Sequence, residues 1–139
     1  MIVKKELSTQ RYGVHDITAD VLEVIRKSGV RNGTVTVQAP HSTAGIAACV
    51  YRDEDVAADL MNELRRVIPA RITYRHETSP DDAAGHIKAA LFGNSATTIL
   101  LDGKPVGDEK LGWYFLEYDG PRARTFYVAV TADRQEAWT

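Results

Sequence analysis

The chain of 139 residues is close to the commonest size of a single domain and long enough to bury one substantial hydrophobic core. With 44% hydrophobic residues, 26% charged residues and only five prolines, its composition excludes a disordered or fibrous protein. A formal net charge of −2 excludes attraction of nucleic acid or acidic lipid by the whole surface and leaves room only for a local basic patch.

The first thirty residues predict two strands and a helix. Residues 2–7 and 12–17 are short and rich in residues that favour strands, and a polar connection joins them, so they are expected to form an opening antiparallel pair. Thr18 is placed to cap a helix whose apolar face lies within residues 21–25. Gly29 follows as the expected C-terminal stop.

The next segment predicts two strands around a polar corner and then a second helix. Residues 34–38 alternate with period two, and residues 45–51 read as another strand. His41 lies in the corner between these two strands. Asp53 is expected to cap an amphipathic helix that Pro69 ends.

A third, shorter helix follows the polar and irregular stretch of residues 70–80. Either Asp81 or Asp82 is expected to cap it, and Gly93 ends it. His86 falls near the first turn, where the helix dipole disfavours the protonated ring. A neutral imidazole is the form that binds a metal or accepts a proton.

Three further strands are predicted at residues 97–101, 112–118 and 124–131, separated by hairpin-type turn signals. Helices placed between such strands indicate an α+β domain in which the helices pack on a largely antiparallel sheet. No repeat or linker divides the chain, so we expect one domain over residues 2–132 and a loose tail over residues 133–139.

Cys49 is the only cysteine, which excludes an intrachain disulfide. No charged and then apolar leader opens the chain, so a reducing, cytoplasmic setting is expected. Because Cys49 stands between Ala48 and Val50, the sequence predicts a buried and inert thiol. No apolar run is long enough to span a bilayer, and no membrane partner is expected.

Three of the four histidines lie in short polar segments that we expect to converge: His41, His76 and His86. Histidine titrates near neutrality and also binds borderline metals as a neutral ring, so this set indicates a polar functional site. Simpler interpretations stay open, namely a corner hydrogen bond for His41 and a solvated surface position for His76. His15 has no such polar neighbours and is interpreted as structural or exposed.

Charged residues near these histidines offer partners for them. Of Asp81 and Asp82, one is expected to cap the helix and the other to accept the free N–H of a metal-binding imidazole. Arg122 and Arg124 alternate along a strand, so they lie on the same side of it. One of them is a candidate phosphate-binding fork, and the alternative is a pair of solvated charges at the strand edge.

Five motifs in a fixed order then identify a family likeness. They are Asp16-Ile17-Thr18, Pro40-His41-Ser42-Thr43-Ala44, Tyr74-Arg75-His76, the stretch of residues 81–93, and Glu117-Tyr118-Asp119-Gly120-Pro121-Arg122-Ala123-Arg124. With this order and spacing, from about residue 5 to residue 131, the chain resembles the YjbQ-like family, whose members are associated with secondary thiamine-phosphate synthase activity.

The resemblance implies a compact α+β sandwich with about three packed helices that assembles as a homotrimer. It also implies that the histidine motifs meet near a subunit interface and, in some members, hold a metal such as zinc. The resulting hypothesis is group transfer on a small phosphorylated substrate. Its expected divalent-metal ligands are His41, His76 and His86, its catalytic residues are these three with Asp81, and its phosphate-binding residues are Ser42, Thr43 and Arg122. Three histidine ligands with one open position are typical of a catalytic site.

Two segments depart from the family pattern. Cys49-Val50-Tyr51 stands where relatives carry Asn-Glu-Asn, so the glutamate is absent. Residues 106–112 stand where relatives carry Leu-Gly-Thr-Trp-Gln, with Trp113 displaced. A second hypothesis is therefore a non-catalytic protein that keeps the scaffold and binds a metal or small ligand. Nucleic-acid binding has little support, because basic residues do not alternate with aromatic residues along the chain.

Overall fold

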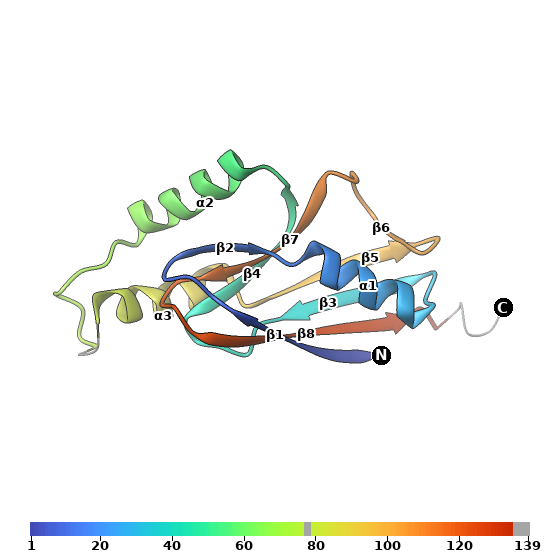
Figure 1. Cartoon of the computed structure of the whole chain (residues 1–139), viewed down its shortest axis with the longest axis horizontal. Helices are drawn as coiled ribbons and strands as arrows, with labels where there is room; N and C mark the ends of the chain where they lie inside the picture. The colour runs from blue at the N-terminus through green and yellow to red at the C-terminus, as the bar shows by residue number, and fades with distance from the viewer. Residues whose placement is uncertain (77–78, 135–139) are drawn as a thin grey trace.

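The computed structural model describes residues 1–76 and 79–134. Along the chain its elements are β1 (Ile2–Ser8), β2 (Gly13–Asp16), α1 (Thr18–Ser28), β3 (Gly33–Gln38), β4 (Ala44–Tyr51), α2 (Glu54–Val67), α3 (Pro80–Phe92), β5 (Ser95–Leu101), β6 (Lys104–Pro105), β7 (Leu111–Glu117) and β8 (Ala123–Ala132). Figure 1 shows α2 lying on the side of β2, β7 and β4, while β1, β8 and β3 lie on the opposite side of the molecule.

The strands form two antiparallel sheets, which confirms the α+β expectation. One sheet has five strands in the order β1-β8-β3-β5-β6, and the other has three in the order β2-β7-β4. The predicted opening pair is wrong, because β1 pairs with β8 and β2 pairs with β7 in the other sheet. The pairing of β1 with β8 is extended by one residue, because the backbone N–H of Thr9 donates to the carbonyl of Arg122, just before β8. The chain therefore leaves β1 along β8 and not along β2.

Strand β7 separates two hydrophobic cores. Trp113 and Phe115 belong to the larger core, which lies between the sheets and includes the buried face of α1. Tyr114 and Leu116 point the other way and pack under α2. Because successive side chains of a strand alternate between its faces, a strand buried on both sides must be apolar throughout, as residues 113–116 are.

Helix α2 begins as its sequence predicts, whereas α1 does not. The Asp53 carboxylate accepts the backbone N–H groups of Asp55 at 2.8 Å and Val56 at 3.2 Å, as an N-cap should. Thr18, in contrast, is the first residue of α1 and uses its hydroxyl oxygen to accept the backbone N–H of Trp113. The predicted cap therefore fastens α1 to β7 instead of closing the helix end.

Helix α3 is also capped differently from the sequence prediction. Ser79 is its N-cap, and the Ser79 hydroxyl accepts the backbone N–H of Asp82 at 3.2 Å. Neither Asp81 nor Asp82 caps the helix, so both carboxylates are available for other side chains. Gly93 ends the helix as expected, and the left-handed Gly29 (φ 69°) ends α1.

The prediction that Cys49 is buried is wrong. The pairing of β4 with β7 is irregular between Ala47 and Val50, and Cys49 adopts a left-handed backbone conformation with φ 58°. This bulge interrupts the alternation that a regular strand would continue, and it leaves the Cys49 side chain exposed.

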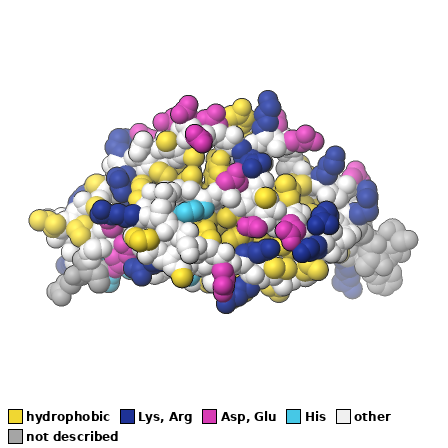
Figure 2. All heavy atoms as spheres, viewed as in Figure 1, with side chains coloured by type: hydrophobic (Ala, Val, Ile, Leu, Met, Phe, Trp, Pro, Cys, Tyr) yellow, Lys and Arg dark blue, Asp and Glu magenta, His cyan; other side chains and the backbone are white. Residues whose placement is uncertain are grey.

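Figure 2 shows acidic and basic side chains interspersed over the face in view, with hydrophobic side chains between them. Within residues 1–76 and 79–134, no helix combines the length and apolar character needed to cross a membrane. Of the tail predicted over residues 133–139, Asp133 donates its backbone N–H to the Asn32 carbonyl, and residues 135–139 lie outside the described residues.

Candidate functional site

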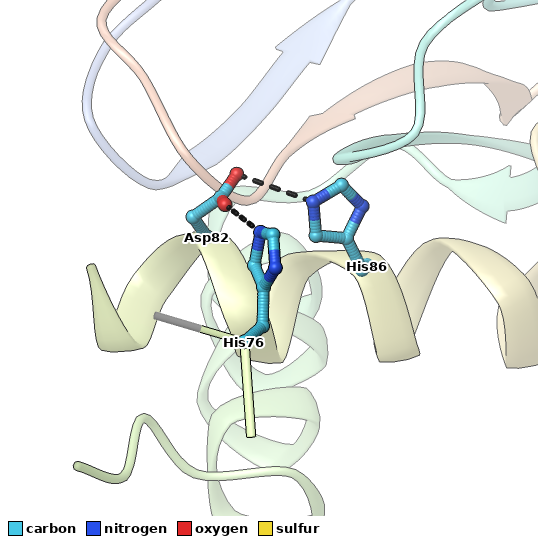
Figure 3. Close-up of side chains that lie close together, drawn as sticks. All are labelled: His76, Asp82 and His86. Atoms are coloured by element: carbon cyan, nitrogen blue, oxygen red, sulfur yellow. Dashed lines mark hydrogen bonds and ion pairs between the residues drawn. The ribbon is translucent and has the colours of Figure 1, made fainter. Parts of the chain in front are cut away.

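His76, Asp82 and His86 converge beside the N-terminal half of α3 (Figure 3). The His76 Nε2 atom lies 2.7 Å from Asp82 Oδ2, and the His86 Nε2 atom lies 3.4 Å from Asp82 Oδ1. The two imidazole rings are 4.9 Å apart between centroids and nearly perpendicular. One carboxylate thus contacts both histidines, each through a different oxygen.

Local structure explains why these three side chains meet. Asp82 and His86 are four residues apart on α3, so they share one face of the helix. His76 comes from the loop before α3, which is fastened by a 2.7 Å hydrogen bond from the Tyr74 hydroxyl to the Pro69 carbonyl. Asp82 is the most shielded of the three, with 16% of its side chain exposed, whereas His76 is about half exposed. The histidines therefore face solvent with the carboxylate beneath them.

His41 does not belong to this group. Its Nε2 atom accepts the backbone N–H of Thr125 at 3.0 Å, and its ring meets the edge of Phe115. The structure thus supplies the corner hydrogen bond that the sequence left open as an alternative. The corner nevertheless packs on α3, because a Cβ atom added at Gly85 would lie 3.3 Å from Thr43. The corner therefore contacts the helix that carries His86 through Thr43, whereas the His41 ring contacts Thr125 and Phe115.

Beneath the corner lies a buried ion pair between Glu117 and Arg124. Arg124 Nε lies 2.8 Å from Glu117 Oε1, and the Arg124 Nη2 group also donates to the Thr43 hydroxyl at 2.8 Å. The Thr9 hydroxyl donates to the same carboxylate. Glu117 is fully buried, and only 5% of Arg124 is exposed. This network occupies the Thr43 hydroxyl, which the sequence assigned to phosphate binding.

The other predicted site residues are placed as follows. Ser42 is exposed in the turn after His41. The exposed Arg122 guanidinium donates from Nε to the Asp119 carbonyl and from Nη2 to the Asp119 carboxylate. The hydrogen bond and the charge of the Asp119 carboxylate raise the pKa of Arg122, with smaller contributions from the charges of Glu117 and Asp82. Asp81 pairs with Arg11 at 3.0 Å instead of a histidine. Asp82, and not Asp81, is therefore the aspartate that lies beside the histidines.

Sequence reasoning missed a buried lysine on another face of α3. Lys88 is 3% exposed, and its ammonium group lies 4.7 Å from the centroid of the Tyr12 ring. The Arg65 guanidinium lies 3.9 Å from the same centroid. Burial, reinforced by the charge of Arg65, lowers the pKa of Lys88 to about 8. A single lysine within a helical pattern gives no sign of such burial, because the tyrosine that covers it is far away in the sequence.

Protonation of His41 is expected to destabilise the fold. Burial and then the Arg124 charge lower the pKa of His41, although the Thr125 hydrogen bond and Glu117 oppose them. A lowered pKa means that the unfolded chain binds the proton first as pH falls through about 6.5, so stability is present above that pH and is lost below it. We expect the free energy of unfolding to fall between pH 7.5 and 5.5, and to fall less in His41→Gln.

Chemical denaturation at both pH values measures this difference. His15→Gln is the matched control, because burial also lowers the pKa of His15. This variant removes the contribution of His15 to the pH dependence and leaves that of His41. Equal pH dependence in the wild-type protein and His41→Gln would show that His41 does not contribute.

Comparisons with known proteins agree along nearly the whole chain. A family model described as UPF0047 protein YjbQ-like matches residues 4–133. The UPF0047 protein of Methanocaldococcus jannaschii is 38% identical over 135 residues, which is 96% of each chain. UPF0047 protein YugU of Bacillus subtilis is 32% identical over 124 residues, covering 87% of this chain and 91% of YugU.

Solved structures show the same likeness in three dimensions. A YjbQ/UPF0047 family protein from Clostridium acetobutylicum matches with a TM-score of 0.85 and 35% identity, covering 93% of this chain and 99% of that one. A YbjQ-like protein from Sulfolobus solfataricus matches with a TM-score of 0.89 and 25% identity, covering 96% and 97%. The fold is therefore shared with these proteins.

Proposed function

This chain belongs to the UPF0047 family of YjbQ-like proteins, and we propose that it binds a divalent metal ion and acts on a small phosphorylated substrate at that site. The observation that carries the proposal is the convergence of His76, Asp82 and His86, whose ligand atoms all lie within 4.8 Å of one another. The proposed ligand set replaces His41, expected from the sequence, with Asp82.

The residues present fit a metal ion of the zinc type. Two imidazole nitrogens and one carboxylate oxygen are a donor set found in catalytic zinc and non-haem iron sites, which keep at least one position open. Ligand atoms about 2 Å from a tetrahedral ion lie about 3.3 Å from each other. The 3.4 Å separation between His86 Nε2 and Asp82 Oδ1 has this spacing, and the exposed His76 ring has room to adjust.

We assign phosphate recognition to two exposed residues, Arg122 and Ser42, and Arg122 is close enough to Asp82 for that carboxylate to raise its pKa. A bound divalent ion supplies Lewis-acid stabilisation of negative charge on phosphate oxygens. Arg122 is held by Asp119 through Nε and Nη2, which fixes the guanidinium while half of its side chain remains exposed for a phosphate oxygen. Ser42 offers an exposed hydroxyl for the same group. Thr43 is left out of this set because its hydroxyl already binds Arg124.

We further propose that the reaction is a group transfer of the secondary thiamine-phosphate synthase type, carried out by a homotrimer. The support for this finer proposal is the family resemblance of the motifs. A second candidate is a non-catalytic protein that binds the metal or a small ligand. It is favoured by one observation, Cys49-Val50-Tyr51 in place of the Asn-Glu-Asn run, which removes an acidic group from β4.

Complementation of a strain that lacks thiamine-phosphate synthase tests the catalytic proposal. We expect the wild-type gene to restore growth without thiamine, and Asp82→Asn and His86→Ala to abolish the rescue, because each removes a metal ligand. His15→Ala, a histidine outside the cluster, is expected to rescue like the wild type. If a wild-type protein that binds metal never rescues the strain, the non-catalytic candidate is supported instead.

A further inference from the structure

A second cavity of about 400 Å³ lies away from the histidine cluster. Helix α1, the bulge of β4, strand β5 and the arm of residues 104–113 enclose it, and no member of the histidine cluster lines it. Figure 1 shows α1 and β6 toward one end of the long axis of the molecule and α3 toward the other. The volume is within the range of about 300–1,000 Å³ that is typical of small-molecule sites.

Two residues that line this cavity each carry a buried polar side-chain atom without a hydrogen-bond partner. Among the described residues, three buried side-chain atoms have none: Thr98 Oγ1, Trp113 Nε1 and Tyr118 Oη. The first two belong to residues that line the cavity, and these residues are only 7% and 4% exposed. A buried indole N–H without an acceptor is unfavourable, and in native proteins nearly all buried polar groups have a hydrogen-bond partner. An acceptor brought by a ligand would satisfy it.

The remaining lining indicates what else the ligand must be. Leu22 and Leu111 provide apolar side chains, which suit a ligand with an apolar body. The charged residues of the lining have both signs, because it includes Lys104 and the acidic residues 108–109. Arg52, which also lines the cavity, is already paired with Asp16 at 2.9 Å. Neither sign prevails, so the lining favours a neutral molecule.

We propose that this cavity binds a small, neutral, largely apolar molecule whose hydrogen-bond acceptor receives the indole N–H of Trp113. The Thr98 hydroxyl, which rotates freely about its own bond, donates to or accepts from the same polar end of the ligand. Cys49 lies at the cavity wall and reports its occupancy, because it is exposed and is the only cysteine of the chain. The site does not depend on the metal proposal.

Quinoline and naphthalene are matched probes for this proposal, since they share a shape and only quinoline carries an acceptor nitrogen. Titration of ¹⁵N-labelled protein with quinoline is expected to shift the Trp113 indole N–H resonance saturably, with Trp113→Phe identifying that signal. Quinoline should also slow the reaction of Cys49 with a thiol reagent at least about threefold. Naphthalene should bind about 2- to 10-fold more weakly, which is the loss expected for one hydrogen bond.

Two variants locate the binding. Thr98→Val conserves the side-chain shape and removes an unpartnered hydroxyl, so it should fold and bind quinoline more weakly. Leu22→Trp places a large side chain at the mouth from a half-exposed helix position and should abolish both readouts.

Four results would overturn the proposal. Three of them are an absent or non-saturable shift, equal binding of quinoline and naphthalene, and unchanged binding by Leu22→Trp. The fourth is a reaction of Cys49 with the thiol reagent that is slow without ligand and becomes faster when the protein is diluted. Such a result would show that a second copy of the chain covers the cavity.

Discussion

Replacing Asp82 with alanine is expected to weaken zinc binding by at least about 100-fold. Asp82 contacts both His76 and His86 and is the only carboxylate among the described residues that converges with them. Loss of residues that merely orient metal ligands costs about 10- to 100-fold in affinity, so loss of a ligand should cost at least as much. Isothermal titration of untagged protein with zinc measures the effect, and His76→Ala and His86→Ala should match it.

Two control variants separate this ligand set from the alternatives. Asp81→Ala changes the neighbouring residue and breaks only the exposed pair with Arg11, so its zinc affinity should stay within about twofold of wild type. His41→Ala should also leave the affinity unchanged, because the His41 ring binds the Thr125 backbone. If His41→Ala abolishes binding while Asp82→Ala does not, the set of three histidines expected from the sequence is correct and the structural assignment is wrong.

The contrast between Asp81 and Asp82 illustrates what local sequence can decide. Helical periodicity predicts α3 and places His86 on it. The sequence also predicts an aspartate beside a histidine and names Asp81 among the catalytic residues, whereas the structure places Asp82 beside both histidines. Because Ser79 caps the helix, neither aspartate is used as the cap. Asp82 lies one helical turn before His86 and contacts it, whereas Asp81 points toward Arg11 on the β1–β2 connection. Arg11 is 70 residues away in the sequence, so no local pattern reveals it.

Strand pairing escaped prediction for a similar reason. Residues 2–7 and 12–17 were correctly identified as strands, because β propensity is local. Their partners, β8 and β7, lie between 98 residues (Asp16 with Tyr114) and 127 residues (Ile2 with Ala129) later in the sequence, and the short separation of the two strands favours the wrong pairing. Cys49 was misplaced because a bulge is invisible in an apolar run. Residues from both segments that depart from the pattern implied by the family resemblance, 49–51 and 106–112, contribute to the lining of the second cavity.

Loss of the Glu117 carboxylate is expected to have the largest effect on stability. Glu117→Ala leaves the Arg124 guanidinium buried without its counter-ion and removes the acceptor of the Thr9 hydroxyl. Breaking a buried pair from one side costs about 3–5 kcal/mol, which is a large part of the stability of about 5–15 kcal/mol of a typical domain. Urea denaturation measures it. Arg122→Ala breaks the half-exposed pair with Asp119 and should cost about 1 kcal/mol or less.

The double variant Glu117→Leu/Arg124→Met distinguishes an unpaired charge from lost packing. It buries no charge, so it should be more stable than Glu117→Ala, and a double variant as unstable as the single one would contradict this explanation. The pH dependence gives a second check. Burial raises the pKa of Glu117, but hydrogen bonds from Arg124, Thr9 and Asp119 outweigh it and hold the pKa below the ordinary glutamate value of 4.5. The pair therefore contributes stability above about pH 4.5 that is lost as pH falls through the lower pKa of the folded state, and the double variant should lack this loss.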